Sequence, residues 1–337
     1  MGQDRQGLKP GPARLQPGRT GARLRPAWHQ SLAANTRRAG QNARVSAAGF
    51  IVAASDQFDF RATILSHGWL MLPPFRWDDD SGTLSYLLKS SSGELLRLQM
   101  SEARGGVRVA LPQCARLNPA LQAEVTTAVK QMLNIDWDLR PFYRAMRAHE
   151  GYAWLETERR GRILVCPSLW EDLAKVLLTT NCSWSQTINM TSQLCQLGAP
   201  CPADPDWRAF PTPQRVAALP RDELAAAVRA GYRTAWLHEL ARRITDGDID
   251  LARWPTLDSD ALFEAVKSLK GFGDYAAGTV ARMLGHFNRI AIDTACHAMF
   301  AARHNGGVKG SAADIQAHYA RFGRWQGLVM WMDIMRG

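Results

Sequence analysis

Asp293 is well placed in this sequence to do chemistry on a charged intermediate. It lies in the apolar run 290–295, which reads Ile-Ala-Ile-Asp-Thr-Ala, and it follows Gly273 by 20 residues. A carboxylate partly shielded from water can stabilise positive charge that develops in a transition state, and it can orient or activate water. An aspartate at such a position can instead cap the N-terminus of the helix that follows. The residue type and its spacing fit both roles.

A glycine-rich hairpin precedes Asp293. Residues 269–277 read Leu-Lys-Gly-Phe-Gly-Asp-Tyr-Ala-Ala, so Lys270, Gly271, Phe272 and Gly273 form a turn between two predicted helices. Glycine lets the backbone turn tightly and approach a ligand closely, and amide N–H groups that feed a helix N-terminus attract anions. A DNA backbone phosphate is one such anion. The alternative is a helix C-cap and a tight turn that serve packing alone.

Three further positions complete the candidate site residues. Asn181 follows an apolar helical segment and offers a polar side chain at its end, where its alternative role is that of a helix C-cap. Trp184, just beyond it, and Trp137 are candidates for stacking on a planar ligand. Other tryptophans at helical spacing are expected in the core: Trp236, Trp325 and Trp331. The histidines and cysteines show no ligand spacing, so no metal site built from side chains is predicted.

Residues 51–116 predict a small antiparallel β domain. Apolar and polar residues alternate over 58–64, which is the period of a strand. Turn-rich stretches separate three further apolar segments, at 83–89, 95–100 and 107–111. Four short strands joined by hairpin-like turns predict a meander, and such a sheet needs another element against its apolar face.

Residues 117–337 predict a larger all-α domain, so the expected fold class is α+β. Apolar side chains recur at the spacing of amphipathic helices in several segments of this region. Gly231 is expected at the end of one helix, and Pro213 at the start of another. Ser311 followed by Asp314 predicts an N-terminal cap before the last helices.

Composition excludes several classes of protein. Hydrophobic residues make up 46% and charged residues 21% of the 337 residues, which is typical of a folded globular chain and excludes a disordered polar chain or a rod. No apolar run approaches the ~18 residues of a membrane-spanning helix. The six cysteines include no C-x-x-C pair and are expected to be reduced thiols in a cytosol-like compartment.

Charge is concentrated at the N-terminus. Residues 1–50 hold nine basic residues and one acidic residue, so they carry +8 of the net charge of +10. We expect this basic tail to be disordered, because it has too little apolar surface to offset the entropy of ordering. A transit peptide for an organelle and a wrongly chosen start codon are both open alternatives for it. The expected location is otherwise the cytoplasm, in association with the nucleoid.

These residues together resemble the helix-hairpin-helix (HhH-GPD) DNA glycosylase superfamily. In that family an L-x-G-x-G hairpin is followed at this distance by an aspartate in a V-D-T setting, which Ile292-Asp293-Thr294 matches closely. Residues 172–186, 210–213 and 231–233 resemble further landmarks of the family. The expected strands resemble the N-terminal β domain of its 8-oxoguanine and alkylbase branches. The resemblance spans roughly residues 56–337, and it is most specific over 269–294.

The resemblance implies a role for each candidate residue. Asp293 would be the catalytic carboxylate, the hairpin Lys270–Gly273 would bind a DNA phosphate, and Asn181 would enter the gap left by an extruded base. A monovalent cation held by hairpin carbonyls is also implied by the resemblance. The partner would be double-stranded DNA that contains a damaged base, bound by a monomer without any membrane association.

Two departures from the family refine this expectation. Members that also cleave the DNA strand place a lysine two residues after the second hairpin glycine, and this chain has Tyr275 there. A phenol cannot form a Schiff base, so we expect a monofunctional DNA N-glycosylase. No cysteine follows Cys296, so the iron–sulfur cluster of several branches is not expected.

Other functions remain open from the sequence. The chain could be a non-catalytic helix-hairpin-helix protein that binds DNA, or a bifunctional glycosylase/AP lyase of the 8-oxoguanine type. A helical scaffold unrelated to DNA is a third alternative. The presence of Asp293 at the family spacing favours an enzyme, because a binding module has no need of a carboxylate near phosphates. The damaged base itself cannot be named from these residues.

Overall fold

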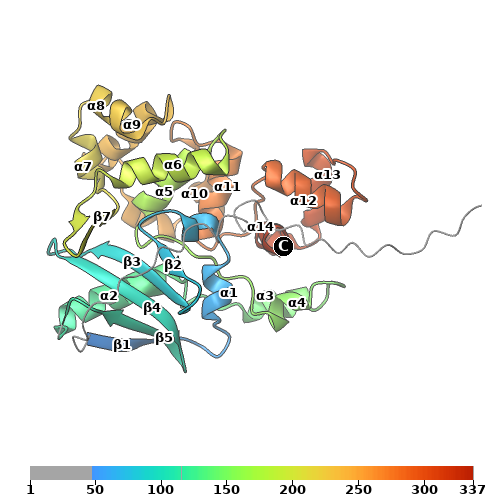
Figure 1. Ribbon diagram of the computed structural model, residues 1–337. Coiled ribbons are helices and arrows are strands. Elements are labelled where there is room, and N and C mark those ends of the chain that lie inside the picture. The colour runs from blue at the N-terminus through green and yellow to red at the C-terminus, as the bar shows by residue number, and fades with distance from the viewer. Residues whose placement is uncertain (1–47, 115, 337) are drawn as a thin grey trace, which may run out of the picture.

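A five-stranded sheet and two groups of helices make up the computed structural model, which describes residues 48–114 and 116–336 (Figure 1). Figure 1 shows the sheet below the helices α5–α10, with α12–α14 on the other side of the molecule and α11 between the two groups. The α+β fold predicted from the sequence is confirmed. The predicted disordered tail lies outside the described residues except for 48–50, and these three belong to a strand rather than to a tail.

The sheet is antiparallel, with the strand order β1-β5-β4-β3-β2. Its strands are β1 (Ala48–Ala53), β2 (Arg76–Asp78), β3 (Thr83–Lys89), β4 (Leu95–Ala103) and β5 (Gly106–Leu111). The segments predicted at 83–89, 95–100 and 107–111 are therefore confirmed as strands. They alternate between buried and more exposed residues, as a sheet with one covered face requires.

The strand predicted over 58–64 is wrong. Residues Phe60–Ile64 form the short helix α1, and the Asp59 carboxylate caps it by accepting a hydrogen bond from the Ala62 amide at 2.6 Å. Phe60, Thr63 and Ile64 are its buried residues, so the burial follows the helical period rather than the strand period. A segment of seven residues is too short for its alternation to distinguish the two.

Helix α2 (Pro119–Met132) contributes to the core beneath the sheet. Val125, Val129 and Met132 are fully buried in one continuous core with the inward-facing strand residues, such as Leu98 and Val109. That core also runs into the helical region, because buried residues of both parts belong to the same cluster. The boundary at 116/117 stays a prediction.

The remaining helices follow α2 along the chain. They are α3 (Arg140–Met146), α4 (Trp154–Thr157), α5 (Leu169–Thr179), α6 (Trp184–Cys195), α7 (Pro213–Ala217), α8 (Arg221–Val228), α9 (Arg233–Thr245), α10 (Ser259–Lys267), α11 (Asp274–Met283), α12 (Thr294–His304), α13 (Ala312–Ala320) and α14 (Gln326–Met335). Within the described residues the chain also forms 3₁₀ turns at η3 (Gly68–Met71), η4 (Leu251–Thr256) and η5 (Gly323–Trp325). No helix in the described ranges is both long and apolar enough to cross a membrane.

Several predicted helix ends are confirmed. Ser311 and Asp314 form a reciprocal capping box at the start of α13, and Pro213 begins α7. The helix end expected at Gly231 is wrong by two residues, because α8 ends at Val228 and its left-handed C-cap is Arg229, with a φ of +50°. Gly231, with a φ of +61°, lies in the turn just before α9. The predicted all-α region is not purely helical, because β6 (Pro200–Cys201) and β7 (Asp204–Arg208) form a two-stranded sheet within it. Strands this short left no periodic signal in the sequence.

Candidate active site

The glycine hairpin joins α10 to α11, and its two glycines have different conformations. Gly271 has a φ of +88°, and a Cβ there would overlap the Trp236 ring and lie 2.7 Å from Leu177 Cδ1. Gly273 is exposed, has a φ of −89°, and has open space where a Cβ would lie. Glycine is therefore required by the fold at 271, whereas at 273 the fold itself does not need it.

The lysines of the hairpin are paired with carboxylates. Lys270 Nζ lies 2.9 Å from Glu239 Oε2 on α9, and Lys267 Nζ lies 2.9 Å from Asp274 Oδ1. Both pairs are solvent-exposed and contribute little stability. Phe272 is buried and serves the core between the helices.

The loop that carries Asn181 is fastened to the hairpin through α9. The buried guanidinium of Arg233 donates hydrogen bonds to the carbonyls of Thr180 and Asn181, from Nε to Thr180 O at 2.9 Å and from Nη2 to Asn181 O at 2.9 Å. Asn181 is exposed and has a φ of +47° directly after the C-cap of α5, which is Thr180. Its backbone thus turns the chain out of the helix, as the alternative interpretation expected, while the side chain lies on the surface.

Asp293 is half-buried and caps α12. Its Oδ1 accepts a hydrogen bond from the Cys296 amide at 2.8 Å, so the predicted capping role is present. Burial raises the pKa of this carboxyl, while the amide hydrogen bond and the charge of Arg282 act in the opposite direction. The segment that leads to Asp293 packs closely on α11. A Cβ added at Gly278 of this helix would lie only 3.2 Å from the side chain of Ala291.

Tyr275 lies on the face of α11 that is turned toward Asp293. Burial raises the pKa of its phenol, and the negative charge of Asp293 raises it further. The hydroxyls of Thr179 and Thr279 lie near the phenol and lower its pKa slightly in return. Asp293 is therefore near enough for its charge to act on the Tyr275 phenol.

Arg282 is a residue of this site that the sequence analysis missed. It is 2% exposed, its guanidinium carbon lies 4.3 Å from the centre of the Trp331 ring, and its Nε and Nη1 atoms are buried without a hydrogen-bond partner. Burial lowers its pKa to about 10, and the charges of Tyr275 and Asp293 oppose that shift. The helical period places Tyr275, Thr279 and Arg282 on one face of α11, but that spacing does not show that the face is buried.

An apolar cluster lies beside this arginine. Met71 and Met335 are its buried members, and Trp184, Ile188 and Trp331 pack against them. Trp184 Nε1 is buried without a hydrogen-bond partner, and a Cβ on Gly68 would lie 2.7 Å from the Trp184 ring. Trp331, expected in the core, packs against the main core and also forms one side of this cluster, where Arg282 lies over its ring.

Trp137, the other aromatic candidate, lies in different surroundings. It packs edge-on against Phe287, with ring centroids 5.3 Å apart, and it lines a shallow hollow with Asp56, Asp138 and Arg140. Among the described aromatic contacts, none joins it to Trp184 or Trp331. The structure thus places the two tryptophan candidates in separate groups.

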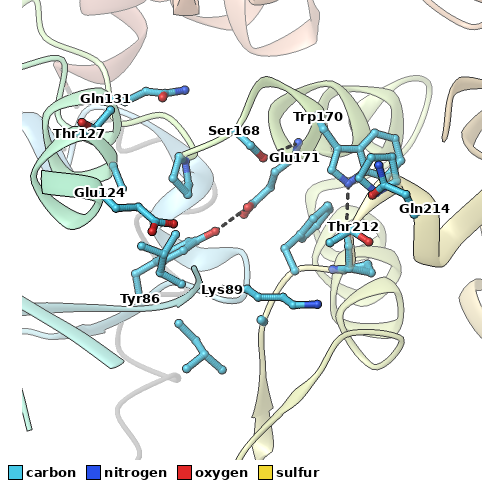
Figure 2. A pocket seen from close by; sticks show the side chains of 18 residues that line it. Tyr86, Lys89, Glu124, Thr127, Gln131, Ser168, Trp170, Glu171, Thr212 and Gln214 are labelled. Carbon is cyan, nitrogen blue, oxygen red and sulfur yellow. Dashed lines mark hydrogen bonds between the residues drawn. The ribbon is translucent and has the colours of Figure 1, made fainter. Parts of the chain in front are cut away.

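A hollow of about 590 Å³ opens between the sheet and α2, α5 and α7 (Figure 2). Several of its polar groups are paired within the protein: the Tyr86 hydroxyl donates to Glu171 at 2.5 Å, and the Trp170 ring nitrogen donates to Pro211 O at 2.8 Å. Glu171 also pairs with the buried Lys175 at 2.7 Å. Figure 2 shows the Tyr86 hydroxyl turned toward Glu171.

No three His, Cys, Asp or Glu side chains within 48–114 and 116–336 are arranged to hold a metal ion. No protein-family profile and no curated protein matches this sequence.

The structure itself is similar to solved structures. It superposes on the 3-methyladenine DNA glycosylase of Archaeoglobus fulgidus with a TM-score of 0.65 and 16% identity, covering 86% of this chain and 98% of that one. The fold is that of the helix-hairpin-helix DNA glycosylases. MBOgg1, solved with a low-affinity DNA ligand, gives a TM-score of 0.65 at 15% identity and covers 87% of this chain and 96% of that one.

A third structure places the same fold on DNA. The 8-oxoguanine glycosylase/lyase of Clostridium acetobutylicum, in complex with double-stranded DNA that contains cytosine opposite 8-oxoguanine, gives a TM-score of 0.64 at 14% identity and covers 83% of this chain and 91% of that one. At such identities the helix-hairpin-helix glycosylase fold is what the chains have in common. What this chain does must be argued from its own site.

Proposed function

We propose that this protein is a monofunctional DNA N-glycosylase of base excision repair. The observation that carries the proposal is the placement of Asp293. It is a half-buried carboxylate packed beside α11, and α11 begins at an exposed glycine hairpin. The solved glycosylases with the same fold support the choice of DNA as the partner.

DNA binding would begin at the hairpin. The backbone N–H groups of Asp274 and Tyr275 open α11 and donate no hydrogen bond within the helix, and the open space at Gly273 allows a phosphate to approach them closely. Such contacts hold the duplex in register and carry no sequence information. Asn181 would fill the gap in the base stack, because its side chain is exposed and its loop is held by Arg233 of α9, the helix whose Glu239 also pairs with Lys270 of the hairpin.

A monovalent cation fits the same hairpin. The backbone carbonyls of Ser268, Lys270 and Gly271 accept no hydrogen bond from any described backbone amide, and carbonyl oxygens are the ligands that alkali cations prefer. Such an ion would add positive charge next to the DNA phosphate. Comparing DNA affinity in potassium chloride and in a bulky organic cation at equal ionic strength tests this.

Base release would then proceed by hydrolysis. Cleavage of an N-glycosidic bond builds positive charge on the sugar, and a carboxylate in a site shielded from water stabilises that charge strongly. Asp293 would supply this charge and orient the attacking water. No strand cleavage is expected from this site, because Tyr275 stands where an attacking amine would be needed.

Replacing the carboxylate tests the proposal. Asp293→Asn keeps the shape and the N-cap, because asparagine caps helices as well as aspartate does. We expect single-turnover base release to fall by about 10²-fold or more, with DNA binding largely preserved.

The matched control is Asp258→Asn. Asp258 caps α10 in the same manner, accepting from the Ala261 amide at 2.8 Å, and is not part of the site. We expect this control to keep full activity. Full activity of the Asp293→Asn protein would move the chemistry elsewhere, and the absence of base release from every lesion by the wild-type protein would favour a non-catalytic DNA-binding protein.

A further inference from the structure

Among the residues that the structure describes, no hydrogen-bond or ion-pair partner accounts for the burial of the Arg282 guanidinium. It is 2% exposed, and its Nε and Nη1 atoms have no hydrogen-bond partner among the described residues. A buried charge is costly unless it is paired, and each unmade hydrogen bond of a buried donor costs about 1–3 kcal/mol. Contact with the Trp331 ring at 4.3 Å offsets part of this cost.

The groups around Arg282 belong to the proposed site. Asp293 and Tyr275 are close enough for their charges to act on it, as is the Cys296 thiol, and the His67 ring lies 5.3 Å from the Trp331 ring, on which the guanidinium rests. Burial lowers the pKa of His67, and the positive charge of Arg282 lowers it further. The arginine is therefore a cation at the inner end of a site whose carboxylate is Asp293.

The aromatic side chains beside Arg282 include a second hydrogen-bond donor without a partner. Trp184 Nε1 is buried without a partner, and Trp184 and Trp331 both pack on the apolar pair Met71 and Met335. Two indole rings beside methionine side chains suit a planar, mostly apolar ring system. Unpartnered N–H groups at its edge would suit a ring that carries acceptor oxygens or nitrogens.

The charge of the leaving base decides what such a cation can do. When the C1′–N bond of a neutral damaged base breaks, the electron pair goes to the base, which departs as an anion. Water then adds its oxygen to C1′ and releases one proton, and the base takes up one proton, so that the reaction is balanced. A guanidinium that donates two hydrogen bonds stabilises the anion as it forms.

A damaged base that is already cationic does not leave as an anion, so it does not need stabilisation by a guanidinium. An N-alkylated purine departs as a neutral molecule, and in the ground state its positive charge would be repelled by Arg282. Aromatic walls favour cationic ligands by cation–π contact, but Arg282 itself already covers the Trp331 ring. The same residue would thus favour one class of base and disfavour the other.

We propose that Arg282 is a specificity-determining residue that stabilises the departing anion of a neutral, carbonyl-bearing damaged base, and that it disfavours cationic N-alkylated purines. This inference rests on the proposed glycosylase function and names the class of substrate for the same site.

The test compares both classes of base in one protein and one variant. Duplexes that each carry hypoxanthine, uracil or 8-oxoguanine represent neutral bases, and duplexes that carry 7-methylguanine or 3-methyladenine represent cationic ones. Single-turnover base release is measured for the wild-type protein and for Arg282→Met, which keeps most of the apolar stem and removes the charge. Arg282→Lys tests whether positive charge alone restores part of the rate.

Arg289→Met is the matched control. Arg289 also stacks on an aromatic ring, 4.2 Å from the centre of Phe263, but it is partly exposed and pairs with Asp260 at 2.7 Å. We expect it to leave both classes of reaction unchanged. Thermal melting of all variants separates a loss of folded protein from a loss of rate.

The expected result is release of at least one neutral base by the wild-type protein and about a 10²-fold loss of that rate in Arg282→Met. Release of cationic purines should stay within a few-fold of the wild-type rate or rise. Equal losses for both classes would overturn the inference, because they would show that Arg282 acts through Asp293 or through packing. Wild-type activity on cationic purines alone would also overturn it while leaving the glycosylase function intact, and no release of any base would overturn both.

Discussion

Gly273 offers a way to weaken DNA binding without disturbing the fold, and Gly271 is its natural comparison. The two residues are separated by one position in the same hairpin, yet only Gly271 has a positive φ. A Cβ at 271 would meet Trp236 and Leu177, whereas a Cβ at 273 would meet nothing within 4 Å. One substitution should therefore act on stability, and the other on the DNA interface.

The magnitudes follow from these surroundings. For Gly271→Ala, a left-handed conformation costs about 1–2 kcal/mol and overpacking of a filled core costs about 1–3 kcal/mol, so the free energy of unfolding should fall by about 2–5 kcal/mol. For Gly273→Ala it should change by no more than about 0.5 kcal/mol. If the added methyl group displaces one amide–phosphate hydrogen bond worth about 1.5–3 kcal/mol, affinity for any duplex should fall by roughly 10- to 10²-fold.

Two measurements check this prediction. Urea denaturation gives the free energy of unfolding, and fluorescence anisotropy with an undamaged duplex at one fixed salt concentration gives the dissociation constant. Gly273→Val, which is larger, should weaken binding further with the same stability. If both position-273 variants bind DNA as tightly as the parent, the hairpin is a packing turn and its assigned role as a phosphate clamp is wrong.

The other predictions concern Tyr275 and a buried carboxyl. Reaction with a lesion duplex should leave an intact strand with an abasic site, and borohydride should trap no more than traces of a covalent adduct, whereas Tyr275→Lys should gain trapping; efficient trapping by the wild-type protein would contradict the assignment. Burial raises the pKa of Asp172 from 3.8 to about 7. Between pH 3.8 and pH 7 the Asp172 carboxyl is therefore protonated in the native state and ionised in the unfolded chain. The contribution of Asp172 to the free energy of unfolding consequently falls as the pH rises from 3.8 to 7. Asp172→Asn retains an acceptor for Trp69 Nε1 and the Cys166 amide, and it should remove this loss of stability with rising pH. The measurement is the urea midpoint of the wild-type protein minus that of the variant, followed from pH 4 to pH 7. An unchanged difference across that range would refute it. The opposite slope from His67, whose pKa burial lowers to about 3, is common to both proteins and cancels in that difference.

The sequence by itself determined the features that depend on neighbouring residues. The hairpin at 270–273 lies between two helices because its glycines and the helical periods on either side are local properties. The capping box of Ser311 and the strands at 83–89 and 107–111 are local in the same sense. Local periodicity failed where segments were short, as in α1, and where strands had no alternation, as in β6 and β7.

The interior of the candidate site was decided by the tertiary structure alone. Met71, Trp184, Arg282 and Trp331 come from four separate parts of the chain, and no local pattern relates them. Their meeting depends on how α11 packs between the two groups of helices shown in Figure 1. No sequence expectation singled out Arg282, because charge and spacing do not reveal on which side a helix will be covered. Burial is a property of the whole packed molecule, and it is burial that turns an ordinary arginine into an unpaired cation facing the site.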